Sequence, residues 1–166
     1  MKLSLVTAAL LVTVIAAPSW ASEQGAGFKK IKQQGSLVSY SGTVTLEGEF
    51  WYPIGSGDQE IIGNQLCFNV TDQDSKLIPR DKDDTRSAWF CFKDTQQAAE
   101  QLGVSEFADM EVCEVKGKVS VEVTNYVVDK EQTDTNDVAE LLKVVKKPET
   151  VTVKLLNEGG TPCESE

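Results

Sequence analysis

The sequence predicts a single domain built mainly of β-strands, with one helix between the third and fourth strands. Six segments show the alternation or the short apolar runs of strands, and one segment combines helical spacing with helix-end signals. A barrel of five to six strands accommodates this order of elements. The alternative is a β-sandwich, which the same strands could also build.

The clearest strand signal covers residues 43–52, where side chains alternate between apolar and polar over ten residues. A period of two is that of a strand with one buried face. Gly48, in the middle of the apolar set, predicts a bulge or a bend. The apolar face carries Val44, Leu46, Gly48, Phe50 and Tyr52, and the opposite face carries Thr45, Glu47, Glu49 and Trp51.

Two further strands are expected at residues 65–71 and 87–93, each with phenylalanine on its apolar face. The sixteen residues 71–86 that join them include nine charged ones and Pro79, so we expect an exposed hairpin loop. The five aspartates of this loop suggest calcium, but the spacing lacks the glycine and the closing glutamate of an EF-hand. A solvated loop is therefore the prediction, and no metal site is predicted.

The helix signal begins at Asp94, which forms a variant of the capping box with Gln97. It ends before Gly103, the residue type favoured just after a helix. Ala98 and Leu102 share one face, so this helix can pack closely on a sheet. Residues 105–110 are expected to add a short helical turn.

Three more strands are expected after the helix. Residues 115–128 give the longest signal, with Val119, Val121, Val123 and Val127 assigned to one face. Residues 138–145 are apolar on both faces, which leaves a buried strand or a short helix open, and we favour a strand. Residues 150–156 alternate again and predict the final strand.

The four cysteines are predicted to form two disulfides. Cys67 and Cys91 lie directly across from each other if the second and third strands form an antiparallel hairpin. Cys113 would then pair with Cys163 and tie back the C-terminal tail, which is one of three possible connectivities. The spacings of 24, 22 and 50 residues contain no CxxC pair, which argues against a thioredoxin-like site and against a four-cysteine zinc site.

Residues 1–21 have the pattern of a secretory signal peptide. Lys2 supplies a positive charge, residues 3–17 form an uncharged apolar run, and a small-x-small cleavage sequence ends at Ala21. We therefore expect a mature chain that begins at Ser22 and resides in the periplasm or outside the cell. Residues 22–41 are expected to be a polar lead-in, and residues 42–166 a single β-rich domain with a disulfide-tied tail.

The chain is acidic, with a formal net charge of −10 that becomes −11 when Lys2 leaves with the signal peptide. Such a charge repels nucleic acid and anionic lipid. We therefore expect no nucleic-acid partner, and no stable membrane insertion once the signal peptide is removed. The charge suits a cationic partner, and the alternative explanation is solubility alone.

The composition also bears on catalysis. The chain has no histidine, which excludes a Ser-His-Asp triad and a histidine metal centre. Phosphate loops and glycine-rich nucleotide fingerprints are absent, so no cofactor is predicted. Glu47 and Glu49 share a strand face, whereas the two carboxylates of a glycosidase face each other across a cleft. We therefore predict that the protein is not an enzyme.

The order of three strands, a helix and two or more strands, over about residues 42–145, resembles that of small bacterial periplasmic OB-fold domains. The resemblance is one of element order. It implies a barrel with the helix at one end, and it suggests a binding role. Trp51 and Trp89 point away from the core face, and on such a barrel they would lie on the usual ligand face, with Glu47 and Glu49 beside Trp51.

There the tryptophans could stack on a sugar, a peptide or a partner protein. The alternative is that they pack beneath a loop or the N-terminal arm. Two functions follow as hypotheses. The first is a non-catalytic exported binding or accessory domain, and the second is an acidic inhibitor or immunity-type protein that blocks a cationic enzyme such as a lysozyme.

Overall fold

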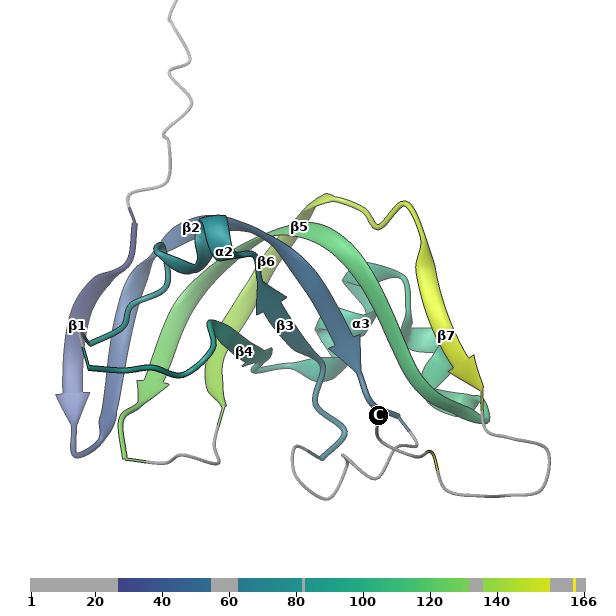
Figure 1. Ribbon diagram of the computed structural model, residues 1–166, viewed down its shortest axis with the longest axis horizontal. Helices are drawn as coiled ribbons and strands as arrows, with labels where there is room; N and C mark the ends of the chain where they lie inside the picture. The colour runs from purple at the N-terminus through teal and green to yellow at the C-terminus, as the bar shows by residue number, and fades with distance from the viewer. Residues whose placement is uncertain (1–26, 55–62, 82, 132–135, 156–162, 164–166) are drawn as a thin grey trace, which may run out of the picture.

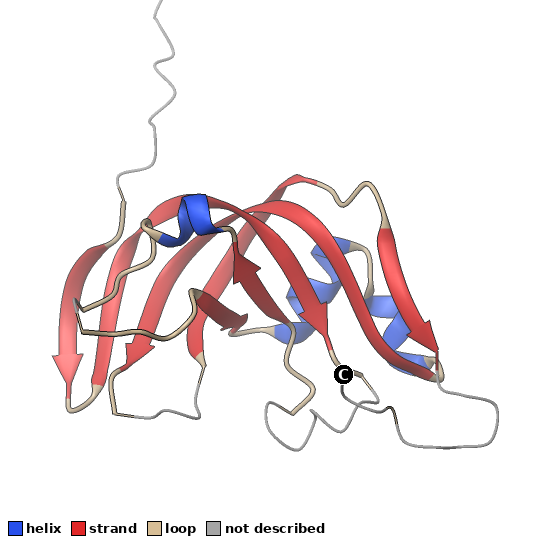
Figure 2. Cartoon of the chain, viewed as in Figure 1, coloured by secondary structure: helices blue, strands red, loops and turns tan. Residues whose placement is uncertain are grey.

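The computed structural model describes residues 27–54, 63–81, 83–131, 136–155 and 163, so the expected signal peptide lies outside the described residues. Strands dominate this part of the chain (Figure 2). The strands are β1 (Lys29–Gln34), β2 (Leu37–Tyr52), β3 (Cys67–Val70), β4 (Trp89–Phe92), β5 (Val112–Asp129), β6 (Asp137–Lys146) and β7 (Val151–Leu155). The helices are α2 (Asp72–Ser75), α3 (Thr95–Leu102) and the 3-10 helix η1 (Ser105–Asp109).

Five strands form a partly closed ring. The sheet order is β1-β2-β3-β4-β6-β5-β7, and an additional pairing between β2 and β5 joins the ring. The pairing of β4 with β6 is parallel, and the others are antiparallel. The long β2 and β5 arch side by side across the molecule (Figure 1). The mainly β class is confirmed, with α3 between β4 and β5, the third and fourth strands of the ring in chain order.

Aromatic side chains fill the ring. Phe50, Phe68, Phe90, Phe92 and Tyr126 are all fully buried, and the rings of Phe90 and Phe92 meet edge to face with their centroids 5.5 Å apart. This core is why the alternation of residues 43–52 predicted β2 correctly.

Gly48 makes room for this core, and of the bulge or bend expected there no bulge is present. The register between β2 and β5 runs through Gly48 without a shift. A Cβ atom at Gly48 would lie 2.7 Å from ring carbons of Phe68, so only glycine fits. Gly117 on β5 pairs with Phe50 and likewise leaves space for its ring, because a Cβ atom at Gly117 would lie 2.7 Å from a ring carbon of Phe50.

Helix α3 forms as the sequence predicts. The Asp94 carboxylate accepts a hydrogen bond from the backbone N–H of Gln97 at 2.9 Å, and Gly103 adopts the left-handed conformation with φ 74°. Ala98, Ala99 and Leu102 are buried in the core. The short turn expected at residues 105–110 is η1, which packs beside α3.

The polar lead-in expected for residues 22–41 is wrong within its described part. Residues 29–34 form β1, which pairs antiparallel with β2, and β2 itself begins at Leu37. All six residues of β1 are exposed, so backbone pairing rather than a buried face holds this strand. A strand with no buried side chain leaves no apolar alternation in the sequence.

Strand β5 also corrects one assignment. The expected alternation puts Val127 on the same face as Val119, Val121 and Val123. However, Asn125 adopts a positive φ of 49°, and at this point the pairing of β5 shifts its register with both β2 and β6. This irregularity reverses the alternation, so Tyr126 and Val128 point into the core instead.

The remaining expectations on strands hold with small shifts of bounds. Residues 138–145, left open between strand and helix, belong to β6, and β7 forms within residues 150–156. The exposed hairpin loop expected at residues 71–86 is wrong in part: it contains α2, buries Ile78 and is anchored to β6 by two arginines. Among the described residues, no helix is long and apolar enough to cross a membrane.

Candidate functional site

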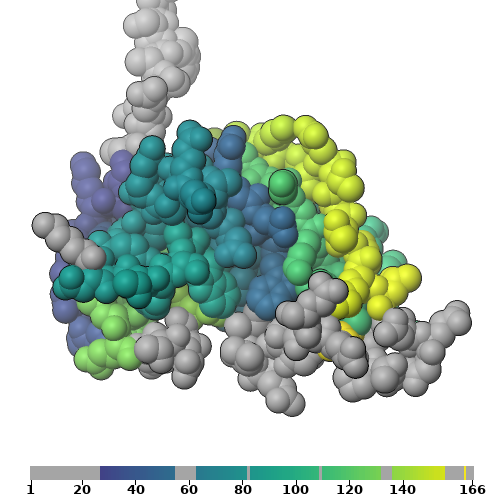
Figure 3. Space-filling view, viewed as in Figure 1, coloured from purple at the N-terminus to yellow at the C-terminus, as the bar shows by residue number. Residues whose placement is uncertain are grey.

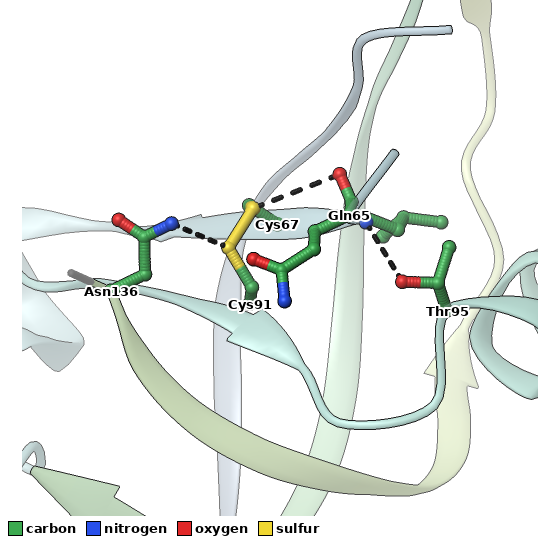
Figure 4. Close-up of a disulfide and its surroundings, with 6 residues drawn as sticks. Gln65, Cys67, Cys91, Thr95 and Asn136 are labelled. Carbon is green, nitrogen blue, oxygen red and sulfur yellow. Dashed lines mark hydrogen bonds between the residues drawn. A yellow bond between two sulfur atoms is a disulfide. The ribbon is translucent and has the colours of Figure 1, made fainter. Parts of the chain in front are cut away.

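The disulfide between Cys67 and Cys91 crosslinks β3 and β4 on the outside of the ring (Figure 4). The backbone hydrogen bonds Phe92 N to Leu66 O and Val70 N to Ala88 O place this cysteine pair in the non-hydrogen-bonded register, where side chains lie closest. The Asn136 amide donates to the sulfur of Cys91 at 3.1 Å. Cys113 is bonded to Cys163, so both predicted disulfides are confirmed.

Trp51 and Trp89 pack against this disulfide, outside the aromatic core. Both indoles are half-buried, and they contact the sulfur pair rather than the ring interior. The Trp51 Nε1–H donates to the carboxylate of Glu114 at 2.9 Å, and the Lys116 ammonium lies 5.9 Å from the Trp51 ring centroid. The outward direction expected for both tryptophans is observed, and among the described residues they pack against the disulfide.

A groove of about 540 Å³ lies along the outer face of β2 and β5, and its lining residue Lys116 lies across from Trp51. Its third side is the connection between β6 and β7. In Figure 3, β2, β5 and this connection lie next to one another on the visible face. We call this feature the mixed-charge groove; its lining includes the acidic residues Glu47, Glu49 and Glu149 and the basic residues Lys116, Lys118, Lys146 and Lys147.

Strand pairing fixes the layout of the groove. Directly paired residues of an antiparallel sheet share a face, so Glu47 on β2, Ser120 on β5 and Lys146 on β6 form one row across three strands. The next row pairs Glu49 with Lys118. Ser120 is small and only 8% exposed, which leaves the middle of the first row as the floor of the groove.

Helix α2 holds the acidic side of the groove in place. β3 ends at Val70, and beyond it Thr71 N donates to the carbonyl of Glu47 at 2.9 Å. The Asp74 carboxylate accepts from the backbone N–H of Glu47 at 2.8 Å. Asp74 is therefore committed to positioning β2, and among the described residues no cluster of three or more acidic or cysteine side chains is arranged to hold a metal ion.

The charges of the groove fall into two sets. Lys116 pairs with Glu114 at 2.9 Å, and Lys146 pairs with Glu149 at 2.9 Å. The hydrogen bond from Lys146 lowers the pKa of Glu149, and the same contact raises the pKa of Lys146. In the part of the chain that the structure describes, Glu47, Glu49, Lys118 and Lys147 have no ion pair within 4.0 Å.

A second polar cluster lies elsewhere and is centred on a buried carboxylate. Arg80 and Arg86, from the connection between β3 and β4, both contact Asp137, which is only 2% exposed. The Tyr126 hydroxyl donates to the same carboxylate at 2.8 Å. Burial raises the pKa of Asp137 in spite of the two arginines. The hydrogen bond from Arg86 lowers the pKa of Asp84 to about 2.

Of the four residues predicted for a binding face, Glu47 and Glu49 line the groove and the two tryptophans do not. Trp51 lies across from the lining residue Lys116. Trp89 lies across from Asn69, which in turn lies across from Glu49. Sequence reasoning missed the lysines of β5 and of the β6–β7 connection. Lys118 was identifiable as outward-facing, but its position across from Glu49 depends on the pairing of β2 with β5.

Chemically, the groove can bind a ligand that carries charges of both signs, since its carboxylates and ammonium groups lie one or two strand spacings apart. Comparisons with known proteins add no identity: no protein-family model matches the chain, and no match was found among curated proteins or solved structures.

Proposed function

We propose that this protein is an exported, non-catalytic binding domain with an OB-type barrel, and that its ligand occupies the mixed-charge groove. The observation that carries the proposal is the groove itself. It is of the size of small-molecule sites, its lining residue Lys116 lies across from Trp51, and four of its charged side chains have no ion pair within the described residues.

Several features support the OB-type barrel. The ring order β2-β3-β4-β6-β5, the parallel pairing of β4 with β6 and the helix after the third ring strand agree with a five-stranded Greek-key barrel of this kind. Two disulfides are compatible with export, since disulfides persist in oxidising compartments.

The test is to follow backbone amides by NMR while candidate ligands are added by class: oligosaccharides, short peptides and polyamines. One class should shift the amides of residues 47–51 and 116–120 in a saturable manner. Trp51→Phe should weaken that binding, and the matched variant Trp89→Phe should leave it unchanged, because Trp51 and not Trp89 contacts the lining residue Lys116. Shifts confined to other surfaces, or no shifts with any class, would refute the proposal.

The acidic inhibitor remains a second candidate function, favoured by the net charge of −10. On that proposal the protein inhibits a cationic enzyme such as a lysozyme, and the inhibition weakens steeply with salt because the association is steered by charge. An inhibition assay at low and at physiological salt tests this. Full lysozyme activity at both, with the protein in excess, removes this enzyme as the partner.

A further inference from the structure

We infer that the mixed-charge groove binds a short peptide with free termini, its ammonium group against β2 and its carboxylate against the β6–β7 connection. This inference rests on the proposed function, because it names the ligand class of the same groove. Its basis is the placement of charge: the carboxylates of Glu47 and Glu49 come from β2, and the ammonium groups of Lys146 and Lys147 come from the far side, where Glu149 pairs with Lys146.

The dimensions of the groove match a tripeptide. Glu47 and Lys146 belong to one row across β2, β5 and β6. Two strand spacings separate the outer members of such a row by about 10 Å, and three extended residues span about 10 Å. The middle of the row is Ser120, whose small side chain leaves room for a backbone to cross the strands.

The central residues suit a peptide backbone. Lys118 and the Ser120 hydroxyl come from β5, between the two charged sides, and both can donate hydrogen bonds to peptide carbonyl groups. Lys118 has no ion pair within the described residues, so its ammonium group is available to a ligand.

Ligands of a single charge fit the groove less well. An anion would neutralise the lysines and leave the carboxylates of Glu47 and Glu49 partly desolvated without a partner, and a cation would do the reverse. A neutral sugar would leave both sets unpaired. A zwitterion is the class that pairs both.

The experiment titrates four matched peptides against the disulfide-bonded protein by calorimetry: trialanine, N-acetyl-trialanine, trialanine amide and N-acetyl-trialanine amide. Trialanine should bind tightest. Blocking either terminus should weaken binding about fivefold, the size of one solvent-accessible ion pair. Blocking both should weaken it further.

Variants then assign each terminus to a side of the groove. Glu47→Gln/Glu49→Gln should remove the preference for trialanine over N-acetyl-trialanine and keep the preference over the amide. Lys146→Gln/Lys147→Gln should do the opposite. The control is Glu122→Gln/Lys143→Gln, an ion pair of β5 and β6 that does not line the groove, and both preferences should survive it.

Three results would overturn the inference: equal binding of all four peptides, no binding of trialanine at millimolar concentration, or preferences that the groove variants do not alter. The proposed function is tested separately. If trialanine fails while an oligosaccharide or a polyamine shifts the groove amides, the peptide inference falls and the binding site stands. If no class shifts these amides, both fall.

Discussion

Two regions of this protein concentrate charged side chains, and they use them differently. In the buried cluster, Arg80 and Arg86 pair with Asp84 and Asp137, and the tyrosine hydroxyl behind them is hydrogen-bonded as well. In the mixed-charge groove, four charged side chains lie open and without ion pairs in the described part of the chain. The cluster anchors a connection to the barrel, whereas the charges of the groove are the ones that we propose to bind a ligand.

The difference follows from solvent. A buried charge without a partner loses its hydration, so each member of the cluster depends on the others. An exposed charge keeps its water and adds little to stability whether or not it is paired. Stability measurements should therefore separate the two regions sharply.

The largest effect is expected from Asp137→Ala. This substitution leaves Arg80, Arg86 and the Tyr126 hydroxyl without their shared acceptor, and removal of one partner from a buried ion pair costs about 3 kcal/mol. Urea unfolding monitored by circular dichroism measures the loss. Asp137→Asn, which retains a hydrogen-bond acceptor, should cost less, and a loss below about 1 kcal/mol for Asp137→Ala would show that the cluster does not anchor the connection.

A smaller effect is expected on acidification. The pKa of Asp84 is lowered from 3.8 to about 2 in the folded protein, chiefly by the hydrogen bond from Arg86. A carboxylate with a lowered pKa stabilises the folded protein at any pH above its unfolded pKa, and this stabilisation is lost as the pH falls toward the folded pKa. The contribution of Asp84 to the free energy of unfolding, about 2 kcal/mol, should therefore disappear between about pH 4 and 2. Asp137 has a raised pKa and contributes with the opposite sign.

Comparison of the natural chain with Asp84→Asn isolates the contribution of Asp84 to the free energy of unfolding. The difference in unfolding free energy between the two proteins should be largest above about pH 4 and should shrink toward pH 2. A difference that stays constant over this range would mean that the ion pair with Arg86 does not perturb Asp84.

The parts of the fold that the sequence predicted are those governed by local patterns. The alternation around Phe50, the caps at Asp94 and Gly103, and the hairpin that pairs Cys67 with Cys91 all depend on residues close in sequence or on a single hairpin. The side of the barrel on which Trp51 lies followed from alternation in the same way.

The features that the sequence did not predict depend mostly on contacts between residues far apart in the chain. Glu49 faces Lys118 because β2 and β5 pair in one register, although about seventy residues separate them, and nothing local encodes that register. The anchoring of Arg80 on Asp137 is likewise long-range. β1 was missed for a different reason, since a fully exposed strand has no apolar face to detect.

Trp51 lies beside the ion pair of Lys116 and Glu114. Trp51→Phe should lower the free energy of unfolding by about 1 kcal/mol. The substitution removes the hydrogen bond that Nε1–H donates to Glu114, and such a bond to a half-exposed carboxylate is worth about that much. Trp89→Phe is the matched control, because its indole also packs on the disulfide but makes no side-chain hydrogen bond among the described residues. Equal losses in urea unfolding would mean that packing, not the hydrogen bond, holds Trp51.

The smallest effect is expected in the groove itself. Glu47→Gln and Lys118→Gln each remove a charge that has no ion pair in the described structure, so each should change the unfolding free energy by less than about 0.5 kcal/mol. Glu47→Gln keeps the length of the side chain, Lys118→Gln keeps a hydrogen-bonding group, and neither disturbs the backbone bonds of Glu47 to Thr71 and Asp74. Urea unfolding beside Asp137→Ala gives the comparison directly. If either groove variant lowered the free energy of unfolding by about 2 kcal/mol or more, that charge would be needed for the fold. A side chain whose role is to bind a ligand contributes to binding and not to the stability of the free protein.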